Sequence, residues 1–167
     1  DRVEALRRQY GRMILLNTNF PLHNYAKGPE AAARIFDAYP LKQQKNLLQG
    51  WYVFQRQGYD KFRQAALAIH DRFPRHTIVV RPAPSEDEAP WRHLLDGKPR
   101  VVVSKEGNVV EWIRAADVVI QFNCTTGVEA FLLDVPSIAY RCVPSDLYET
   151  PLPIACSVEA FTQEELL

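Results

Sequence analysis

Two short polar stretches of this chain carry residue types that could hold a phosphorylated ligand. The first is NCTTGVE at 123–129, in which Thr125, Thr126 and Gly127 precede Glu129. Threonine hydroxyls can donate hydrogen bonds to phosphate oxygens, glycine leaves space for a close approach, and amides at a helix start favour negative charge. Glu129, one turn further on, could accept hydrogen bonds from ribose hydroxyls. This stretch therefore indicates a site for a diphosphate or a phosphate monoester.

The same residues also admit a purely structural interpretation. Thr126 and Glu129 have the T-x-x-E spacing of a capping box, in which the hydroxyl and the carboxylate satisfy free backbone amides at a helix start. The chain has neither G-x-G-x-x-G after its first apolar run nor G-x-x-x-x-G-K-[ST], the fingerprints of dinucleotide-binding and P-loop proteins. A phosphate-binding turn and a helix cap both stay open at this point.

The second polar stretch is RPAPSEDE at 81–88, followed closely by Trp91. On composition alone its prolines and acids describe a rigid, solvated turn, in which Ser85 could cap a short helix. The acidic run Glu86–Glu88 is typical of a solvated helix start. Trp91 is the tryptophan that we consider for ligand contact. No D-x-D motif and no metal-type spacing of His, Cys, Asp and Glu occurs, so we expect no metal site.

No residue has a compelling claim to be the catalytic base, and the catalytic residues stay unknown. The four histidines, His23, His70, His76 and His93, are candidates only by type. His23 falls in a loop that follows the first apolar run, whereas His70 and His76 border predicted elements and suit structural or solvated positions.

Composition excludes several classes of protein. The 167 residues contain 20 basic and 20 acidic side chains, so the net charge of zero gives no sign of a nucleic-acid or anionic-membrane binder. The three cysteines have no metal-type spacing and indicate free thiols in a reducing compartment, so we expect a cytoplasmic location. The sequence contains no run of 18 apolar residues, so no membrane-spanning helix is predicted. We expect a single domain covering 1–167.

The elements that must position these residues alternate along the chain. Near-continuous apolar runs predict strands at 12–20, 76–82, 100–104, 117–122 and 135–140. Helical patterns follow at 29–39, at 41–73 in two pieces broken near Gly58, at 109–116 and at 127–133, with a helix-like segment at the N-terminus. Thr162 and Glu165 form a further T-x-x-E that begins a last helix. We expect the chain to be a piece of a longer protein.

Strands that are buried on both faces and alternate with helices are typical of a parallel sheet, so the predicted class is an α/β, Rossmann-like domain with helices on both faces. Ligands bind such sheets outside the carboxyl ends of the strands. Four loops should meet there, at 17–19, 82–86, 123–127 and after Tyr140. Both polar stretches belong to this set.

Three segments, read in order, resemble a known family. They are ILLNTNF at 14–20, IVVRPAPSED at 78–87, and the stretch from Asn108 to Tyr140. Together they look like the C-terminal, nucleotide-sugar-binding half of GT-B-type glycosyltransferases of bacterial surface-polysaccharide (capsule and lipopolysaccharide) biosynthesis. The resemblance implies a CMP- or UDP-sugar donor and no other cofactor. It also implies a glycan or lipid-linked acceptor held by an N-terminal domain, without which we expect the isolated domain to be inactive.

The resemblance also implies roles for residues in both polar stretches. The threonine turn takes the nucleotide phosphate and the glutamate meets the ribose, which points to Thr125, Thr126, Gly127 and Glu129. The second loop usually reads R-P-H-P-S-E, and its His-Pro pair resembles the one that contacts the donor phosphate in sialyl- and Kdo-type transferases. This loop adds Arg81, Pro84, Ser85 and Glu86. Here Ala83 stands where the family has histidine, and alanine can neither donate a hydrogen bond nor carry charge.

Two other functions stay open. One is an enzyme similar to UDP-N-acetylhexosamine 2-epimerase, which shares the two-domain architecture and needs acidic residues near the sugar. The other is a non-catalytic scaffold of a polysaccharide assembly complex, which Ala83 motivates.

Overall fold

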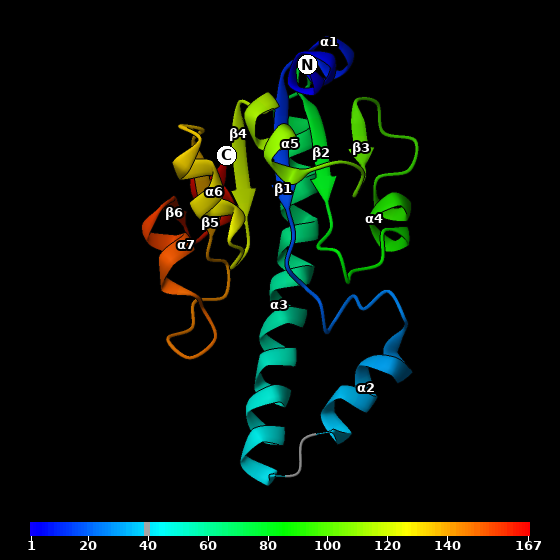
Figure 1. Cartoon of the computed structure of the whole chain (residues 1–167), viewed down its shortest axis with the longest axis vertical. Helices are drawn as coiled ribbons and strands as arrows, with labels where there is room; N and C mark the ends of the chain where they lie inside the picture. Colours follow the sequence, from blue (N-terminus) through cyan, green and yellow to red (C-terminus); the bar gives the residue numbers. More distant parts are fainter. Residues whose placement is uncertain (39–40) are drawn as a thin grey trace.

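The computed structural model describes residues 1–38 and 41–167, which form a six-stranded sheet with helices on both faces (Figure 1). The strands are β1 (Met13–Asn17), β2 (Thr77–Arg81), β3 (Val101–Val103), β4 (Val118–Gln121), β5 (Ser137–Tyr140) and β6 (Val158–Ala160). The helices are α1 (Arg2–Tyr10), α2 (Pro29–Asp37), α3 (Lys42–Arg72), α4 (Ala89–Leu94), α5 (Val109–Ala115), α6 (Thr126–Leu132), α7 (Pro151–Ala155) and α8 (Gln163–Leu166).

The strands lie in the order β3-β2-β1-β4-β5-β6, and each neighbouring pair is parallel. Strands β2 and β3 therefore extend the sheet on one side of β1. Strands β4, β5 and β6 then extend it on the other side of β1. This reversal makes a topological switch point between β1 and β4, where ligands bind in open α/β sheets. The last residue of β1, Asn17, lies opposite Arg81 on β2 and Gln121 on β4. Three polar side chains thus form a row at the carboxyl edge.

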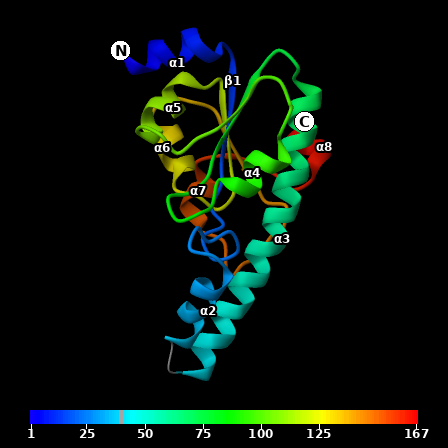
Figure 2. The same ribbon diagram turned by 90° about the vertical axis from the view of Figure 1, so that its right-hand side faces the viewer.

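Alternating strand residues feed two separate cores. One core packs residues such as Leu16 and Val80 against α3 and α8. The other packs residues such as Leu15 and Val79 against α1, α5 and α6. Figure 2 shows the two helical layers on opposite sides of the sheet. The predicted α/β, Rossmann-like class with a parallel sheet covered on both faces is confirmed, because the strands are buried on both sides.

Helix α3 differs from the expectation of two pieces broken near Gly58. It is one helix of 31 residues, and it extends past the carboxyl ends of the strands with α2 beside its far end (Figure 1). Gly58 faces the ring of Phe122, and a Cβ atom there would lie 2.3 Å from Phe122 Cζ. The glycine therefore permits a close approach of α3 to β4 and does not break the helix. The expected helix at 29–39 spans Pro29–Asp37, and Tyr39 lies outside the described residues.

The end of the chain contains two elements that the sequence did not predict. Strand β6 has only three residues, of which two are exposed, and α7 begins with a proline. Elements this short leave no periodic pattern to read. The capping box at the last helix is confirmed, since Thr162 Oγ1 accepts a hydrogen bond from Glu165 N at 3.2 Å and Glu165 Oε2 accepts one from Thr162 N at 3.3 Å.

Candidate functional site

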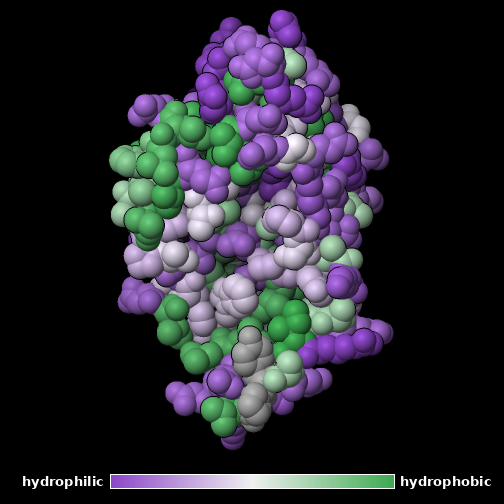
Figure 3. Space-filling model, in the orientation of Figure 1, coloured by the Kyte–Doolittle hydropathy of each residue, from purple (hydrophilic) through white to green (hydrophobic). Residues whose placement is uncertain are grey.

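A cavity of about 460 Å³ opens at the carboxyl ends of β1, β2 and β4. Its walls come from three of the four loops expected there, and from the loop between β3 and α5. The lining residues are Asn17, Thr18, Arg81, Pro82, Ala83, Pro84, Lys105, Val109, Cys124, Thr125, Thr126 and Glu129. Figure 3 shows the face that carries α5 and α6, with hydrophilic residues around a central hollow and apolar residues gathered over α6. The two polar stretches of the sequence therefore meet at one site.

The turn at 123–129 does not contain the predicted capping box, and that prediction is wrong for Thr126 and Glu129. The N-cap residue of α6 is Thr125, and its side chain caps nothing. Thr126, only 8% exposed, lies inside the first turn, and Glu129 N bonds to the carbonyl of Thr125 at 3.2 Å. Thr126 Oγ1 and Glu129 Oε2 are buried without a hydrogen-bond partner among the described residues.

This arrangement changes the balance between the two interpretations of the turn. Buried polar atoms in folded proteins are normally paired with protein atoms or with ordered water. Two such atoms without protein partners, both on residues that line a cavity, are free to pair with something that enters it. A hydroxyl donates to an anionic oxygen and a carboxylate accepts from a hydroxyl. The turn can therefore hold a ligand that carries both an anion and hydroxyl groups.

Gly127 lies beside the cavity but does not line it. A Cβ atom at this position would lie 2.9 Å from Ser157 Oγ and 3.0 Å from Pro153 O. The glycine therefore lets α6 pack closely on α7 and on the segment that follows α7. Its amide donates to Cys124 O at 3.1 Å, inside the turn.

Arg81 lines the cavity, but its guanidinium is already engaged. Nη1 donates to Glu106 O at 2.7 Å and Nη2 donates to Gly107 O at 3.2 Å, with longer contacts to the carbonyls of Ser104 and Lys105. The guanidinium also lies 5.4 Å from the centre of the Trp112 ring. Burial lowers the pKa of Arg81. The side chain thus fastens the loop between β3 and α5 to the sheet.

Glu86 is fully buried and does not line the cavity, so the expectation of a solvated acidic run is wrong for this residue. Its Oε1 accepts hydrogen bonds from Thr18 Oγ1 at 2.6 Å, Phe20 N at 2.9 Å and Ala83 N at 3.1 Å. Its Oε2 accepts one from Asn24 Nδ2 at 3.2 Å. One carboxylate therefore ties the loop after β1 to the loop after β2.

The other residues of the second stretch divide between wall and scaffold. Pro84 and Ala83 line the cavity. Ser85 does not, and its carbonyl accepts a hydrogen bond from Ala26 N at 2.8 Å. Ser85 also does not cap α4, because that helix begins after Glu88.

Sequence reasoning missed two lining residues that matter for charge and hydrogen bonding. Asn17, at the end of β1, is 3% exposed, and its Nδ2 has no partner among the described residues. Lys105 Nζ donates to Pro84 O at 3.3 Å and also to Glu86 O. The strand-end position of Asn17 was a usable signal, because its loop was expected at the binding edge. Lys105 carried no signal, since a lysine after a strand is ordinary.

Cys124 also lines the cavity, between the two threonines of the turn and the sheet. Burial raises the pKa of its thiol, although the neighbouring Thr126 acts in the opposite direction. The sulfur therefore stays protonated at neutral pH and offers a poor nucleophile.

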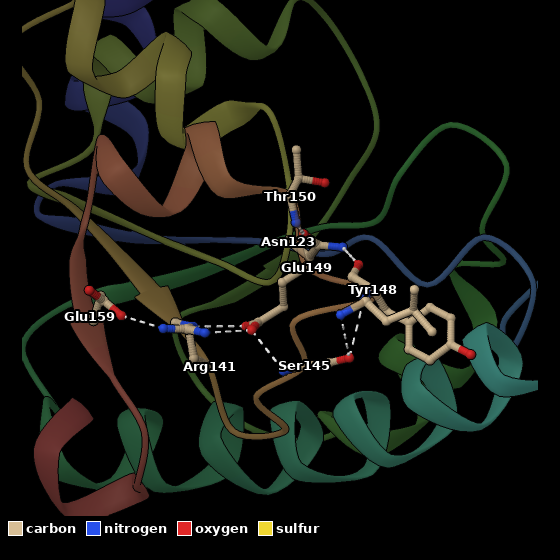
Figure 4. A network of polar contacts seen from close by, with 8 residues as sticks. Asn123, Arg141, Ser145, Tyr148, Glu149, Thr150 and Glu159 are labelled. Atoms are coloured by element: carbon tan, nitrogen blue, oxygen red, sulfur yellow. Dashed lines mark hydrogen bonds and ion pairs between the residues drawn. The ribbon is translucent and has the colours of Figure 1, made fainter. Parts of the chain in front are cut away.

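The fourth loop, after β5, forms a polar network and does not line the cavity at the ends of β1, β2 and β4 (Figure 4). Arg141 donates to both carboxylate oxygens of Glu149, at 2.6 and 2.9 Å, and to Glu159 at 2.6 Å. Asn123 donates to Tyr148 O at 2.9 Å and accepts from Thr150 N at 2.5 Å. These contacts fix the loop against the phosphate-binding turn that we predicted, because Asn123 is the first residue of that turn.

None of the described cavity-lining residues is a histidine. His23 packs edge-on against Tyr52 and Tyr59, and it lines a separate hollow between α2 and α3. Trp91 is fully buried against Tyr59 and Phe62, so the expectation that it contacts a ligand is wrong. A tryptophan near a functional loop can serve the core, and neighbouring sequence does not reveal which role it takes.

Two features are absent from the described part of the chain, 1–38 and 41–167. No group of three or more His, Cys, Asp or Glu side chains lies close enough to hold a metal ion. No helix there combines the length and apolar composition that crossing a lipid bilayer requires.

Comparison with known proteins gives a likeness to solved structures but no match by sequence. No protein-family model and no curated protein matches the sequence. Among solved structures, KpsC from Thermosulfurimonas dismutans, a beta Kdo 2,4 transferase, is similar with 16% sequence identity and a TM-score of 0.46. The similarity covers 83% of this chain and 42% of that chain, so the chain spans less than half the length of that protein. At this level of identity the likeness concerns the fold alone.

Proposed function

We propose that this chain is the nucleotide-sugar-binding domain of a cytoplasmic glycosyltransferase in bacterial surface-polysaccharide biosynthesis, the C-terminal half of a GT-B architecture. The donor is a CMP- or UDP-sugar. A glycan or lipid-linked acceptor and the catalytic base belong to a partner N-terminal domain. The family resemblance of the sequence and the position of the cavity at the switch point support this proposal.

One observation carries the proposal. Thr126 Oγ1 and Glu129 Oε2 are both buried, both on cavity-lining residues and both without a hydrogen-bond partner in the described parts of the chain, 1–38 and 41–167. In the proposed complex the Thr126 hydroxyl donates to a phosphate oxygen and the Glu129 carboxylate accepts from a ribose hydroxyl. A capping box would have used up both groups, so their freedom favours ligand binding over a structural role.

The proposed reaction is a direct displacement. An acceptor hydroxyl, deprotonated by the base of the other domain, forms a bond to the anomeric carbon of the donor. The bond from that carbon to the phosphate oxygen breaks, and the nucleotide departs with the electron pair. Hydrogen-bond donors at the phosphate, such as Thr126, stabilise the negative charge that develops there.

The test is calorimetric titration of the chain with CMP, UDP and ADP, repeated on Thr126→Val. Valine keeps the shape of threonine and removes the hydroxyl. A hydrogen bond to a charged group contributes about 1.5–3 kcal/mol, so the dissociation constant should rise about 10- to 100-fold. The control is Thr150→Val, because Thr150 is exposed and its side chain caps nothing. Unchanged affinity in Thr126→Val would remove the phosphate contact from the proposal.

The alanine at position 83 is the observation that favours a scaffold function. It lines the cavity at the position where the resembled family has histidine. If the cavity is a donor site, Ala83→His places an imidazole donor in it and nucleotide affinity should rise. If affinity does not rise and wild type binds no nucleotide, a non-catalytic scaffold is the better description.

A further inference from the structure

Lys105 is a cation that lacks an anionic partner at the wall of the cavity. It lies on the loop between β3 and α5, is partly buried, and lines the cavity. Its Nζ contacts only the backbone carbonyls of Pro84 and Glu86 among the described hydrogen-bond acceptors. The ion pairs found in the described residues include neither Lys105 nor the neighbouring Arg81. Two cations that make no ion pair with a described residue therefore border the cavity, which the Glu129 carboxylate also lines.

The two cations differ in what they can still do. Arg81 has its guanidinium distributed over the carbonyls of 104–107, so it cannot turn to a ligand without releasing that loop. An ammonium group has three donors, and Lys105 uses two of them on protein carbonyls. The third donor remains for a ligand. A lysine is also a compact point charge on a flexible stem, which can adjust to an anion.

Nearby neutral groups complete a set of donors. Asn17 Nδ2 and Thr126 Oγ1 are buried and have no hydrogen-bond partner among the residues that the structure describes, and both residues line the same cavity as Lys105. Asn17 is 3% exposed and Thr126 is 8% exposed, so neither group is hydrated in the way that a surface side chain is. A phosphate carries several anionic oxygens, which can pair with such groups and with the charge of Lys105.

We propose that Lys105, with Asn17, binds the phosphate of the ligand, and that Lys105 supplies the positive charge that Ala83 cannot. This assignment rests on the proposed function for the nucleotide part of the ligand, but the anion site itself does not depend on it. Lys105, on the loop after β3, also holds the carbonyls of Pro84 and Glu86 on the loop after β2. A phosphate bound by Lys105 therefore lies where these two loops meet.

The experiment compares the nucleotide that wild type binds best, its uncharged nucleoside and inorganic pyrophosphate, by calorimetry on wild type, Lys105→Met and Lys105→Gln. Glutamine keeps a donor for the loop carbonyls and removes the charge, so it serves if the methionine variant does not fold. The control is Lys98→Met, since Lys98 pairs with Asp71 on the surface. We expect nucleotide and pyrophosphate affinity to fall at least about 10-fold in both Lys105 variants, with nucleoside affinity unchanged.

The outcomes separate this inference from the proposed function. Nucleotide binding that is equal in wild type and both Lys105 variants overturns the inference and leaves the function standing. An equal loss for nucleotide and nucleoside shows that Lys105 only shapes the loop, which also overturns it. Pyrophosphate binding that needs Lys105, without nucleotide binding, supports the anion site and removes the proposed function. Absence of binding by every probe overturns both.

Discussion

Glu86 offers the sharpest test of how the site is built. In Glu86→Gln, the amide oxygen can replace Oε1 and keep the hydrogen bonds from Thr18, Phe20 and Ala83. The amide nitrogen then faces Asn24 Nδ2, so two donors oppose each other where Oε2 now accepts at 3.2 Å. One hydrogen bond to a charged acceptor is lost, at about 1.5–3 kcal/mol, and the remaining three lose their charge assistance. We expect the free energy of unfolding to fall by about 2–4 kcal/mol.

The assay is urea unfolding followed by circular dichroism, with slopes compared to exclude a change in the unfolded state. The matched control is Glu88→Gln, two residues away, whose carboxylate makes an ion pair with Arg92 at the surface of α4. That pair should be worth less than about 1 kcal/mol. If Glu86→Gln costs no more than Glu88→Gln, the buried carboxylate does not hold the two loops together, and our account of this edge of the sheet is refuted.

Three further changes test other parts of the fold. Gly58→Ala brings a Cβ to within 2.3 Å of Phe122 Cζ, so overpacking of about 1–3 kcal/mol should outweigh a helix-propensity gain of about 1 kcal/mol, and the thermal midpoint should fall. Arg141→Lys removes the paired contacts to Glu149, whose side chain is 7% exposed. The free energy of unfolding, measured in urea, should fall by about 1–3 kcal/mol, and the same substitution in a Glu149→Gln background should lower it much less. Burial lowers the pKa of His23 below its ordinary value of 6.5. The unfolded chain therefore binds more protons than the folded chain, and the free energy of unfolding should decline as pH falls below about 6.5. His23→Phe should flatten this dependence of the unfolding free energy on pH, and an unchanged dependence would contradict the role given to His23.

The strands were predictable because their burial leaves a direct mark on the sequence. Runs such as TIVVR and VVIQ are apolar without alternation, which only a sheet covered on both faces requires. The parallel order then followed from the intervening helices, and the carboxyl edge followed from the parallel order. Both polar stretches were therefore found where the cavity lies.

What failed depends on contacts between distant residues. Gly58 suggested a helix break because its neighbour across the core, Phe122, is invisible in the local sequence. The T-x-x-E at Thr126 suggested a cap because spacing does not reveal that the N-cap residue is Thr125. Glu86 suggested a solvated acid because its donors, apart from Ala83 N, come from residues 18–24, far along the chain. For Gly58 and Glu86 a tertiary contact overrides a local rule.

The length of α3 has a consequence for the local unfolding of this helix. Every buried residue of this helix lies from Phe54 to Ile69, and none lies from Lys42 to Val53. The unburied section, about 18 Å long at 1.5 Å per residue, is close to the length at which isolated helices are marginal in water. Its amide hydrogens should exchange with deuterium through local fraying, while those from Phe54 onward exchange only when the sheet comes apart. A single unbroken helix would then report two free energies of opening, and its outer turns could melt and reform while the cavity stays intact.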